Sequence, residues 1–300
     1  MEEVIRQRFY NDPAVFIENY IKDFVQTSPL NRLDSFGNSP IFTEPLVGFS
    51  DGNDFLFKRY KSLIADFHLT PREALGNHIM KTPGIYSADL PTVSVISYVL
   101  PIAKDTRLSN RRETRGPSLR WNHTRWQGQE FIFDLSLHLV SLLTELGYEA
   151  IDPEQSSMFK VHELPNGLAS TWSQRHVAYV AGLGTFSLND GFITPKGIAV
   201  RLGSVVTDLK LPCTPRKYSS LYANCLFYKN GSCKKCIERC PYGAITEEGH
   251  NKEKCREALF VHQKPWMDGA YGVGYIGRYA SCGLCQTGVP CENSIPSEEE

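Results

Sequence analysis

The stretch CLFYKNGSCKKCIERCP, residues 225–241, holds four of the nine cysteines in this chain of 300 residues. All nine lie between Cys213 and Cys291, so the first 212 residues contain none. The chain begins with acidic and aromatic residues and lacks the basic flank and apolar core of a secretory signal, so we expect a cytoplasmic protein. Disulfides are rare in that compartment, and a local group of cysteines then indicates metal ligation or thiol chemistry.

The spacing of these cysteines indicates which metal group they bind. Cys233, Cys236 and Cys240, the last followed by Pro241, reproduce the end of the C-x2-C-x2-C-x3-C-P run of bacterial ferredoxins. In two-cluster ferredoxins the fourth cysteine of that run binds the other cluster. We therefore expect two [4Fe-4S] clusters with interleaved ligands. The first takes Cys225, Cys233, Cys236 and Cys291, and the second takes Cys240, Cys255, Cys282 and Cys285.

A zinc ribbon is the alternative metal site. Two C-x2-C pairs would then hold one zinc ion, namely Cys233, Cys236, Cys282 and Cys285. This alternative leaves four clustered cysteines without a role and does not explain the proline after Cys240. Cys213 is spare in the cluster assignment, and we interpret it as a small hydrophobic residue. Clusters ligated only by cysteine pass electrons, so a redox partner or substrate is expected in the cysteine-free part.

Composition excludes several other classes of protein. The sequence is 41% hydrophobic and 22% charged, with no apolar stretch long enough to span a membrane. Its 32 basic and 33 acidic side chains give a net charge of -1, so nothing global calls for a polyanionic partner. Lysines and arginines do gather between residues 229 and 256. We interpret them as a solvated face, with a nucleic-acid contact as the alternative.

Hydrophobic periodicity predicts a mixed α/β (α+β) fold. Residues 1–85 look helical, with a start at Pro13 and an apolar stripe of Val15, Phe16, Tyr20, Ile21 and Phe24. A loop is expected over residues 34–53 and a helix over 55–67. Further along, we expect strands at residues 92–102, 148–151 and 199–206, a long loop at 109–129 and helices at 130–146 and 172–180.

A glycine-rich run, AGLGTFSLNDGFITPKGIAVRLGSVVTDL, covers residues 181–209. Gly182 and Gly184 permit positive φ angles and close approach of the backbone to a bulky ligand. The run lacks the third glycine and the preceding strand of a dinucleotide-binding fingerprint, which disfavours a nicotinamide site. The alternative is that these glycines only form a tight turn between a helix and a strand.

This glycine run, the cysteine order with Cys-Pro, and ASCGLCQTGVPC at residues 280–291 together resemble the corrinoid-dependent superfamily of epoxyqueuosine reductases and reductive dehalogenases. The resemblance implies a nitroreductase-like corrinoid-binding and substrate-binding domain at residues 86–212, with residues 1–85 packed on it, and a ferredoxin-like double-cluster domain at 213–300. It also implies base-off cobalamin reduced through the clusters. The residues placed beside the corrin by motif matching are Ala181, Gly182, Gly184, Thr185, Phe186, Ser187, Thr194, Arg201, Gly203, Cys282 and Gly283.

One expected feature of epoxyqueuosine reductases is missing. Their general-acid aspartate should fall near residues 168–170, where this chain has none. We therefore take His176 as the candidate proton donor, because its ordinary pKa suits general-acid work. Arg175 is the candidate for orienting an anionic or carbonyl group. Helix-surface packing, or contact with the corrin's own amides, is the alternative for both residues.

Three functions follow from these observations. The first is a cobalamin-dependent iron–sulfur reductase acting on a small organic or nucleoside-type substrate, supplied with electrons by an external donor such as ferredoxin or flavodoxin. The second is an electron-transfer protein that reduces a partner's corrinoid or other redox centre. The third is tRNA epoxyqueuosine reduction, which the missing aspartate makes the less favoured choice. No membrane partner is expected.

Overall fold

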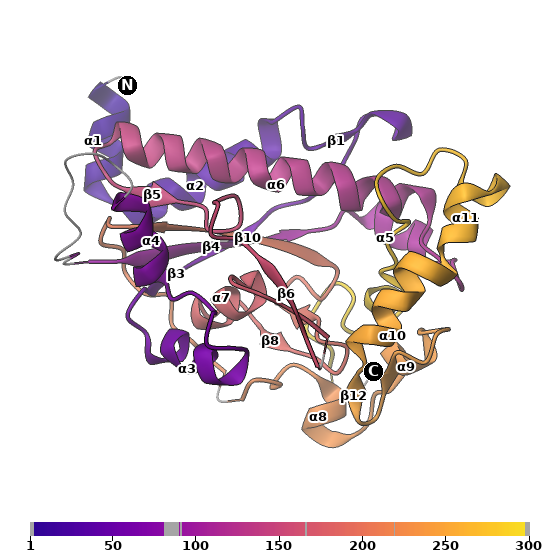
Figure 1. The fold of residues 1–300 in the computed structure, drawn as a ribbon. Helices are drawn as coiled ribbons and strands as arrows, with labels where there is room; N and C mark the ends of the chain where they lie inside the picture. Colours follow the sequence, from indigo (N-terminus) through magenta and orange to yellow (C-terminus); the bar gives the residue numbers. More distant parts are fainter. Residues whose placement is uncertain (1–2, 81–89, 91, 166, 219, 298–300) are drawn as a thin grey trace.

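A four-stranded antiparallel sheet forms the centre of the molecule (Figure 1). Its strands lie in the order β3 (Leu46–Asp51), β4 (Ser94–Pro101), β10 (Val200–Thr207) and β5 (Ala150–Ile151). β4 pairs with β10 along its whole length, from Ser94 opposite Thr207 to Pro101 opposite Val200. The strands predicted at residues 92–102, 148–151 and 199–206 are therefore confirmed.

The protein is seen here as a computed structural model that describes residues 3–80, 90, 92–165, 167–218 and 220–297. The predicted domain boundary at residue 85 lies outside these residues, and the predicted division into domains stays a prediction. Within them, no helix is both long enough and apolar enough to cross a membrane.

Helices cover both faces of the sheet (Figure 1). On one face, α2 (Pro13–Thr27) and α6 (Leu119–Glu145) form a core with Ile96 and Tyr98 of β4. On the other face, α3 (Phe55–Leu63), α4 (Pro71–Ile79) and α7 (Gln174–Val180) form a second core with Val95 and Val99. Successive side chains of a strand point to opposite faces, which is why every residue of β4 is buried. The mixed helix-and-sheet class is confirmed.

The N-terminal part differs from the prediction in two ways. Residues 34–53 are not only loop, because β3 within them is hydrogen-bonded to β4 as the edge strand of the sheet. Pro45 and Gly52 flank β3, and such flanking residues made this stretch look like a loop. In α2 the buried stripe is Ala14, Ile17, Ile21 and Val25, whereas Val15 is 51% exposed. The helices α1 (Glu3–Asn11) and α3 are as expected, although α3 is shorter than residues 55–67.

The loop predicted at residues 109–129 is wrong. Most of it belongs to two helices, α5 (Lys104–Arg111) and the first half of α6. The Ser118 hydroxyl accepts a hydrogen bond from the Trp121 amide and caps the start of α6. The polar residues that hid the helical period face the C-terminal segment: Asn122 donates to the Ala280 carbonyl at 2.8 Å.

The cysteine-rich segment after residue 212 contains only short elements. In the described residues they are α8 (Leu226–Asn230), α9 (Lys235–Glu238), β11 (Ile245–Thr246), β12 (Gly249–His250), α10 (Lys252–Glu257), a π-helical turn (Ala258–His262), α11 (Lys264–Asp268) and two 3-10 turns (Ala270–Gly272 and Leu284–Gln286). Six other short strands lie outside the central sheet and form three antiparallel pairs: β1 (Arg32–Leu33) with β2 (Ser39–Pro40), β6 (Val161–Leu164) with β7 (Gly167–Ser170), and β8 (Thr185–Phe186) with β9 (Phe192–Ile193).

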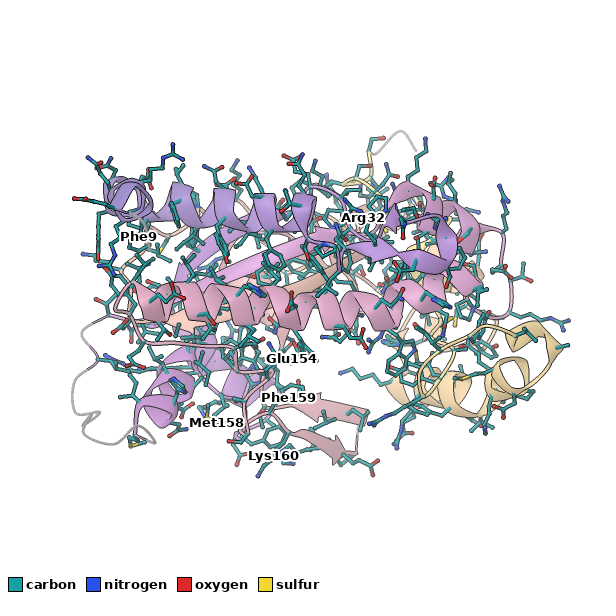
Figure 2. The ribbon with its side chains drawn as sticks, turned by 90° about the horizontal axis from the view of Figure 1, so that it is seen from above. Phe9, Arg32, Glu154, Met158, Phe159 and Lys160 are labelled. Carbon is teal, nitrogen blue, oxygen red and sulfur yellow. The ribbon has the colours of Figure 1, made fainter. Side chains whose placement is uncertain are left out.

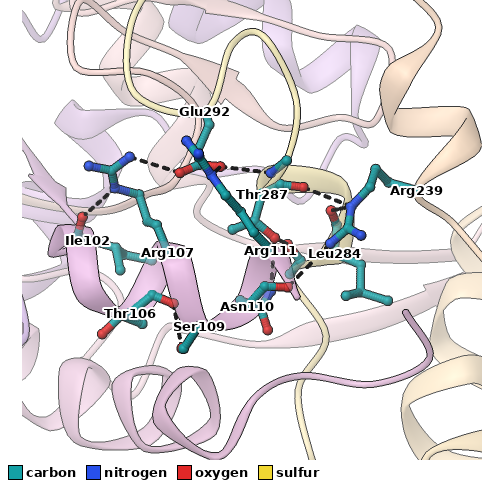
Figure 3. Close-up of polar contacts among 12 residues, drawn as sticks. Ile102, Thr106, Arg107, Ser109, Asn110, Arg111, Arg239, Leu284, Thr287 and Glu292 are labelled. Atoms are coloured by element: carbon teal, nitrogen blue, oxygen red, sulfur yellow. Dashed lines mark hydrogen bonds and ion pairs between the residues drawn. The ribbon is translucent and has the colours of Figure 1, made fainter. Parts of the chain in front are cut away.

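A buried carboxylate ties this segment to α5 (Figure 3). Glu292 has no exposed surface and accepts from Arg107 at 2.9 Å, from Arg111 at 2.6 Å and from the Gly288 amide at 2.7 Å. Beside it, the Arg239 guanidinium donates to the Thr287 carbonyl at 2.9 Å and to the Asn110 carbonyl at 3.3 Å. These contacts fix the position of the cysteine-rich segment against the sheet.

Candidate functional site

The first predicted set of cysteines lines one cavity, together with apolar side chains such as Ile193 and Ile198. Its members are Cys225, Cys233, Cys236 and Cys291. Burial raises the pKa of the Cys236 thiol to about 12, and the nearby Cys225 and Cys233 thiols raise it further. The pKa of Cys291 is also raised, first by burial and then by the other three thiols. Four thiols therefore face one another across a small apolar cavity.

The second predicted set lines a different cavity. Its members are Cys240, Cys255, Cys282 and Cys285. Burial, followed by the Cys282 and Cys240 thiols, raises the pKa of Cys255 to about 11. The pKa of Cys285 is raised well above its ordinary value, by burial first and then by the Cys282 and Cys255 thiols. The two cavities divide eight cysteines into the same two sets that the spacing predicts.

This arrangement disagrees with the zinc ribbon. The zinc ribbon needs its two C-x2-C pairs around one ion, yet Cys233 and Cys236 line one cavity while Cys282 and Cys285 line the other. In the part of the chain that the structure describes, no three His, Cys, Asp or Glu residues converge to bind a metal ion directly. A four-iron cube holds its thiolates farther apart than one ion does. All nine cysteines are free, and Cys213 is the exposed one.

The cavity of the second set continues into a larger cleft. We use this name for three adjoining cavities of about 270, 330 and 390 Å³. Arg175, Gly191 and Arg201 line both of the first two, and Cys255 and Tyr279 line both the first and the third. The cleft separates β10 and α6 from the cysteine-rich segment, with the β6–β7 hairpin along one side (Figure 2). Its size is in the range of small-molecule and cofactor sites.

Three of the eleven residues predicted beside a corrin line this cleft: Arg201, Cys282 and Gly283. Ser187 lines the first cysteine cavity instead. Ala181, Gly182, Gly184, Thr185, Phe186, Thr194 and Gly203 are not among the described residues that line either site.

The glycines explain this difference. Gly182 has a φ of 74°, as a tight turn requires, but a side chain there would meet the carbonyl of Pro215. Gly184 packs on the Ile193 carbonyl, and Gly203 packs on the Tyr98 ring. The close approach that the sequence predicts is therefore to the chain itself at these three positions, which agrees with the alternative interpretation of a turn.

The two predicted catalytic residues lie in different environments. Arg175 lines the cleft and donates to the Asp190 carbonyl. His176 points the other way: its Nδ1 lies 2.7 Å from the Ser173 hydroxyl, and its ring packs against Tyr60. Burial, followed by the charge of Arg175, lowers the pKa of His176 to about 3. A neutral imidazole outside the cleft is poorly placed to donate protons near neutral pH.

Sequence reasoning missed a carboxyl group in the cleft. Glu154 follows β5 and lies beneath α6, near the segment that leads to the hairpin (Figure 2). Gln174 donates to its Oε2 at 2.8 Å, and burial raises its pKa. Gln129 and Arg125 of α6 also line the cleft. Arg125 was hidden by the loop prediction, whereas nothing in the local sequence distinguishes Glu154 from a surface glutamate.

The fold and site define a mixed helix-and-sheet protein with two four-cysteine cavities, one of which opens into a cleft of cofactor size. No family model matches the sequence. The chain is 31% identical to an epoxyqueuosine reductase of Bacillus anthracis and 32% identical to one of Bacillus cereus, each over 188 residues. These alignments cover 62% of this chain and 44% of each relative. The predicted resemblance to epoxyqueuosine reductases is confirmed, although the chain spans about half the length of these curated relatives.

Two solved structures are also similar to this chain. One is of epoxyqueuosine reductase from Bacillus subtilis, with a TM-score of 0.38 and 19% identity, covering 85% of this chain and 63% of that one. The other is of a selenomethionine-labelled epoxyqueuosine reductase, with a TM-score of 0.43 and 18% identity, covering 95% of this chain and 70% of that one.

Proposed function

We propose that this chain is an oxidoreductase of the epoxyqueuosine reductase kind, in which two [4Fe-4S] clusters deliver electrons to a corrinoid that reduces a nucleoside-type or other organic substrate. One observation carries the proposal: the eight cysteines divide between two cavities, and the second cavity opens into the cleft. In this proposal residues 86–212 form a nitroreductase-like domain with residues 1–85 packed on it, and residues 213–300 form a ferredoxin-like domain.

The cleft has the chemistry that a corrinoid requires. A corrin ring is flat and carries amide side chains, so it needs both apolar surface and hydrogen-bonding groups. The cleft supplies Trp121 and Val200 as apolar walls and Gln129, Gln174 and Arg201 as polar partners. The Arg201 Nε–H is buried without a partner, so it is free to bind such a group. When bound, a corrinoid would supply a strongly nucleophilic reduced metal next to the second cluster.

The residue best placed to supply a proton is Glu154. Its carboxyl group faces the cleft, and burial raises its pKa, which favours retention of the proton at Oε. Gln174 fixes the orientation of this carboxyl group through the hydrogen bond to Oε2. In the proposal Glu154 takes the role that the sequence suggested for His176, and Arg175 of α7 orients the substrate.

Metal analysis tests the cofactor part of the proposal. Protein purified without oxygen is expected to hold about eight iron atoms per chain and to bind cobalamin with the spectrum of the base-off form. Cys236→Ser should lose about half of the iron, whereas the matched control Cys213→Ser, which changes the exposed spare cysteine, should lose none. Equal iron in all three proteins, or a loaded wild-type protein that does not bind cobalamin, would count against the proposal.

Complementation tests the substrate part. Epoxyqueuosine is the first substrate to try, because the relatives bear its name. The gene is expressed in a strain that lacks its own epoxyqueuosine reductase, and queuosine in tRNA is measured. A parallel assay uses the purified protein with ferredoxin or flavodoxin as the electron donor. Restoration that is lost in Glu154→Gln and kept in Cys213→Ser supports the proposal. A loaded protein that binds no cobalamin but reduces a partner's corrinoid would instead indicate the electron-transfer function.

A further inference from the structure

Three arginines from three different elements line the cleft. Arg125 lies in α6, Arg175 is the second residue of α7, and Arg201 is the second residue of β10. Among residues 3–80, 90, 92–165, 167–218 and 220–297, no carboxylate lies within ion-pair distance of any of the three. By contrast, Arg107 and Arg111 near the same segment are both paired with Glu292. The cleft therefore has an excess of positive charge.

The hydrogen bonds of these arginines leave donors unused. Arg201 donates from Nη2 to the Gln129 side chain at 2.5 Å, and Arg125 donates from Nη2 to the Tyr279 hydroxyl at 3.1 Å. The Nε of Arg201 and the Nη1 of Arg125 are buried and have no partner. Buried polar groups are normally satisfied, and an unsatisfied charged donor is the more costly case. Two buried donors beside one cavity indicate that a ligand completes their hydrogen bonds.

The electrostatics agree with this geometry. Burial, followed by the charge of Arg125, lowers the pKa of Arg201 to about 9. Glu154 faces the same cavity and attracts Arg201 and Arg125, although its Oε2 is bound by Gln174. Asp190 interacts with His250 at 3.1 Å. Among the described residues, these two carboxylates offset the charges of the three guanidinium groups only in part, and neither carboxylate accepts a hydrogen bond from them.

We propose that Arg125, Arg175 and Arg201 form a subsite that binds a phosphate group of the ligand in the cleft. Phosphate is the best match because guanidinium groups bind it with paired hydrogen bonds and three of them surround one site. This inference deepens the proposed function and rests on it for the identity of the cleft as the ligand site. A phosphorylated substrate and the phosphodiester of a complete cobalamin are the two sources of such a group.

Calorimetry on the cluster-loaded protein tests the subsite. Adenosine 5′-monophosphate and inorganic phosphate should bind, and adenosine should bind at least tenfold more weakly than its monophosphate. Arg201→Gln and Arg125→Gln should each weaken binding of the monophosphate at least tenfold. Arg59→Gln, an exposed arginine of α3, should leave binding unchanged. Circular dichroism checks folding, and if Arg201→Gln fails to fold, Arg125→Gln alone decides the outcome.

A second arm distinguishes the two sources. Cobinamide lacks the phosphodiester that cobalamin carries. If Arg201→Gln weakens cobalamin but not cobinamide, the subsite holds the cofactor's phosphate; if it weakens only the monophosphate, the subsite holds a substrate. Binding of neither phosphate nor the monophosphate by a protein with intact clusters and cobalamin would overturn the inference and leave the proposed function standing. Loss of clusters and cobalamin binding in the wild-type protein would instead refute the proposed function.

Discussion

Replacing Glu292 by alanine should destabilise the protein strongly. The carboxylate is fully buried and accepts from Arg107, Arg111 and the Gly288 amide. Removing one partner of a buried ion pair typically destabilises a protein by about 3–5 kcal/mol, because the remaining charge loses its compensation. The Arg107 side chain is only 16% exposed and cannot easily regain water, whereas Arg111 is 43% exposed and can. We therefore expect about 3 kcal/mol, near the lower end of the range.

Thermal unfolding of the reduced apoprotein measures this change. About 3 kcal/mol corresponds to a fall in Tm of roughly 6 °C for a chain of this size. Glu292→Gln keeps an acceptor for the Gly288 amide and should lose less. The matched control is Glu44→Ala, because Glu44 is 66% exposed and pairs with Lys196 at 3.2 Å, and such surface pairs contribute about 0–1 kcal/mol. Equal shifts for Glu292→Ala and Glu44→Ala would refute the reasoning.

Three further changes have defined outcomes. Gln263 is fully buried and its side chain interacts with the Cys282 thiol. In the proposed cluster assignment, Gln263→Leu should therefore lower the potential of the second cluster by roughly 40 mV in a redox titration, equivalent to about 1 kcal/mol. The unfolded chain binds a proton at His176 below pH 6.5 and the folded chain only near pH 3, so the free energy of unfolding decreases as the pH is lowered through that window. When the pH is lowered from 7 to 5, urea unfolding should show the wild-type protein losing about 2 kcal/mol more stability than His176→Asn. Equal losses in the two proteins would contradict this. Gly283 and Gly231 have φ angles of 74° and 75°, but only a side chain at Gly283 meets an indole ring, so Gly283→Ala should lose iron from the second cavity while Gly231→Ala keeps it.

Local spacing predicted two groups of cysteines, and these same groups line two separate cavities, while their role as cluster ligands stays a prediction. Cys233, Cys236 and Cys240 belong to one short motif, and the other five cysteines were assigned so that each cluster received four ligands. The same local reasoning succeeded for β4, whose run of β-branched residues is buried on both faces. Short patterns of neighbouring residues were therefore enough to predict the grouping of these cysteines and the position of this strand.

The failures depend on contacts between distant parts of the chain. The first half of α6 looked like a loop because His123 and its polar neighbours face the C-terminal segment, where the imidazole contacts the Gly274 carbonyl at 2.7 Å. The turn at Gly182 was recognised, but its partner is Pro215, which no local pattern indicates. Glu154 became a candidate only when the fold placed it in the cleft. In each case a residue far along the chain determines the role.

The attachment of the first cysteine set to the sheet constrains how the protein matures. Cys225, Cys233 and Cys236 are made before Cys291, whose carbonyl accepts from the Ile198 amide at 2.8 Å. The next residue, Glu292, likewise accepts through its carbonyl from the Ala199 amide at 3.2 Å. Three of these thiols are therefore synthesised before the fourth, which is held beside them by the hydrogen bonds of residues 291–292 to residues 198–199. In the proposed assignment, a cluster at this cavity therefore requires the chain to be synthesised as far as Cys291.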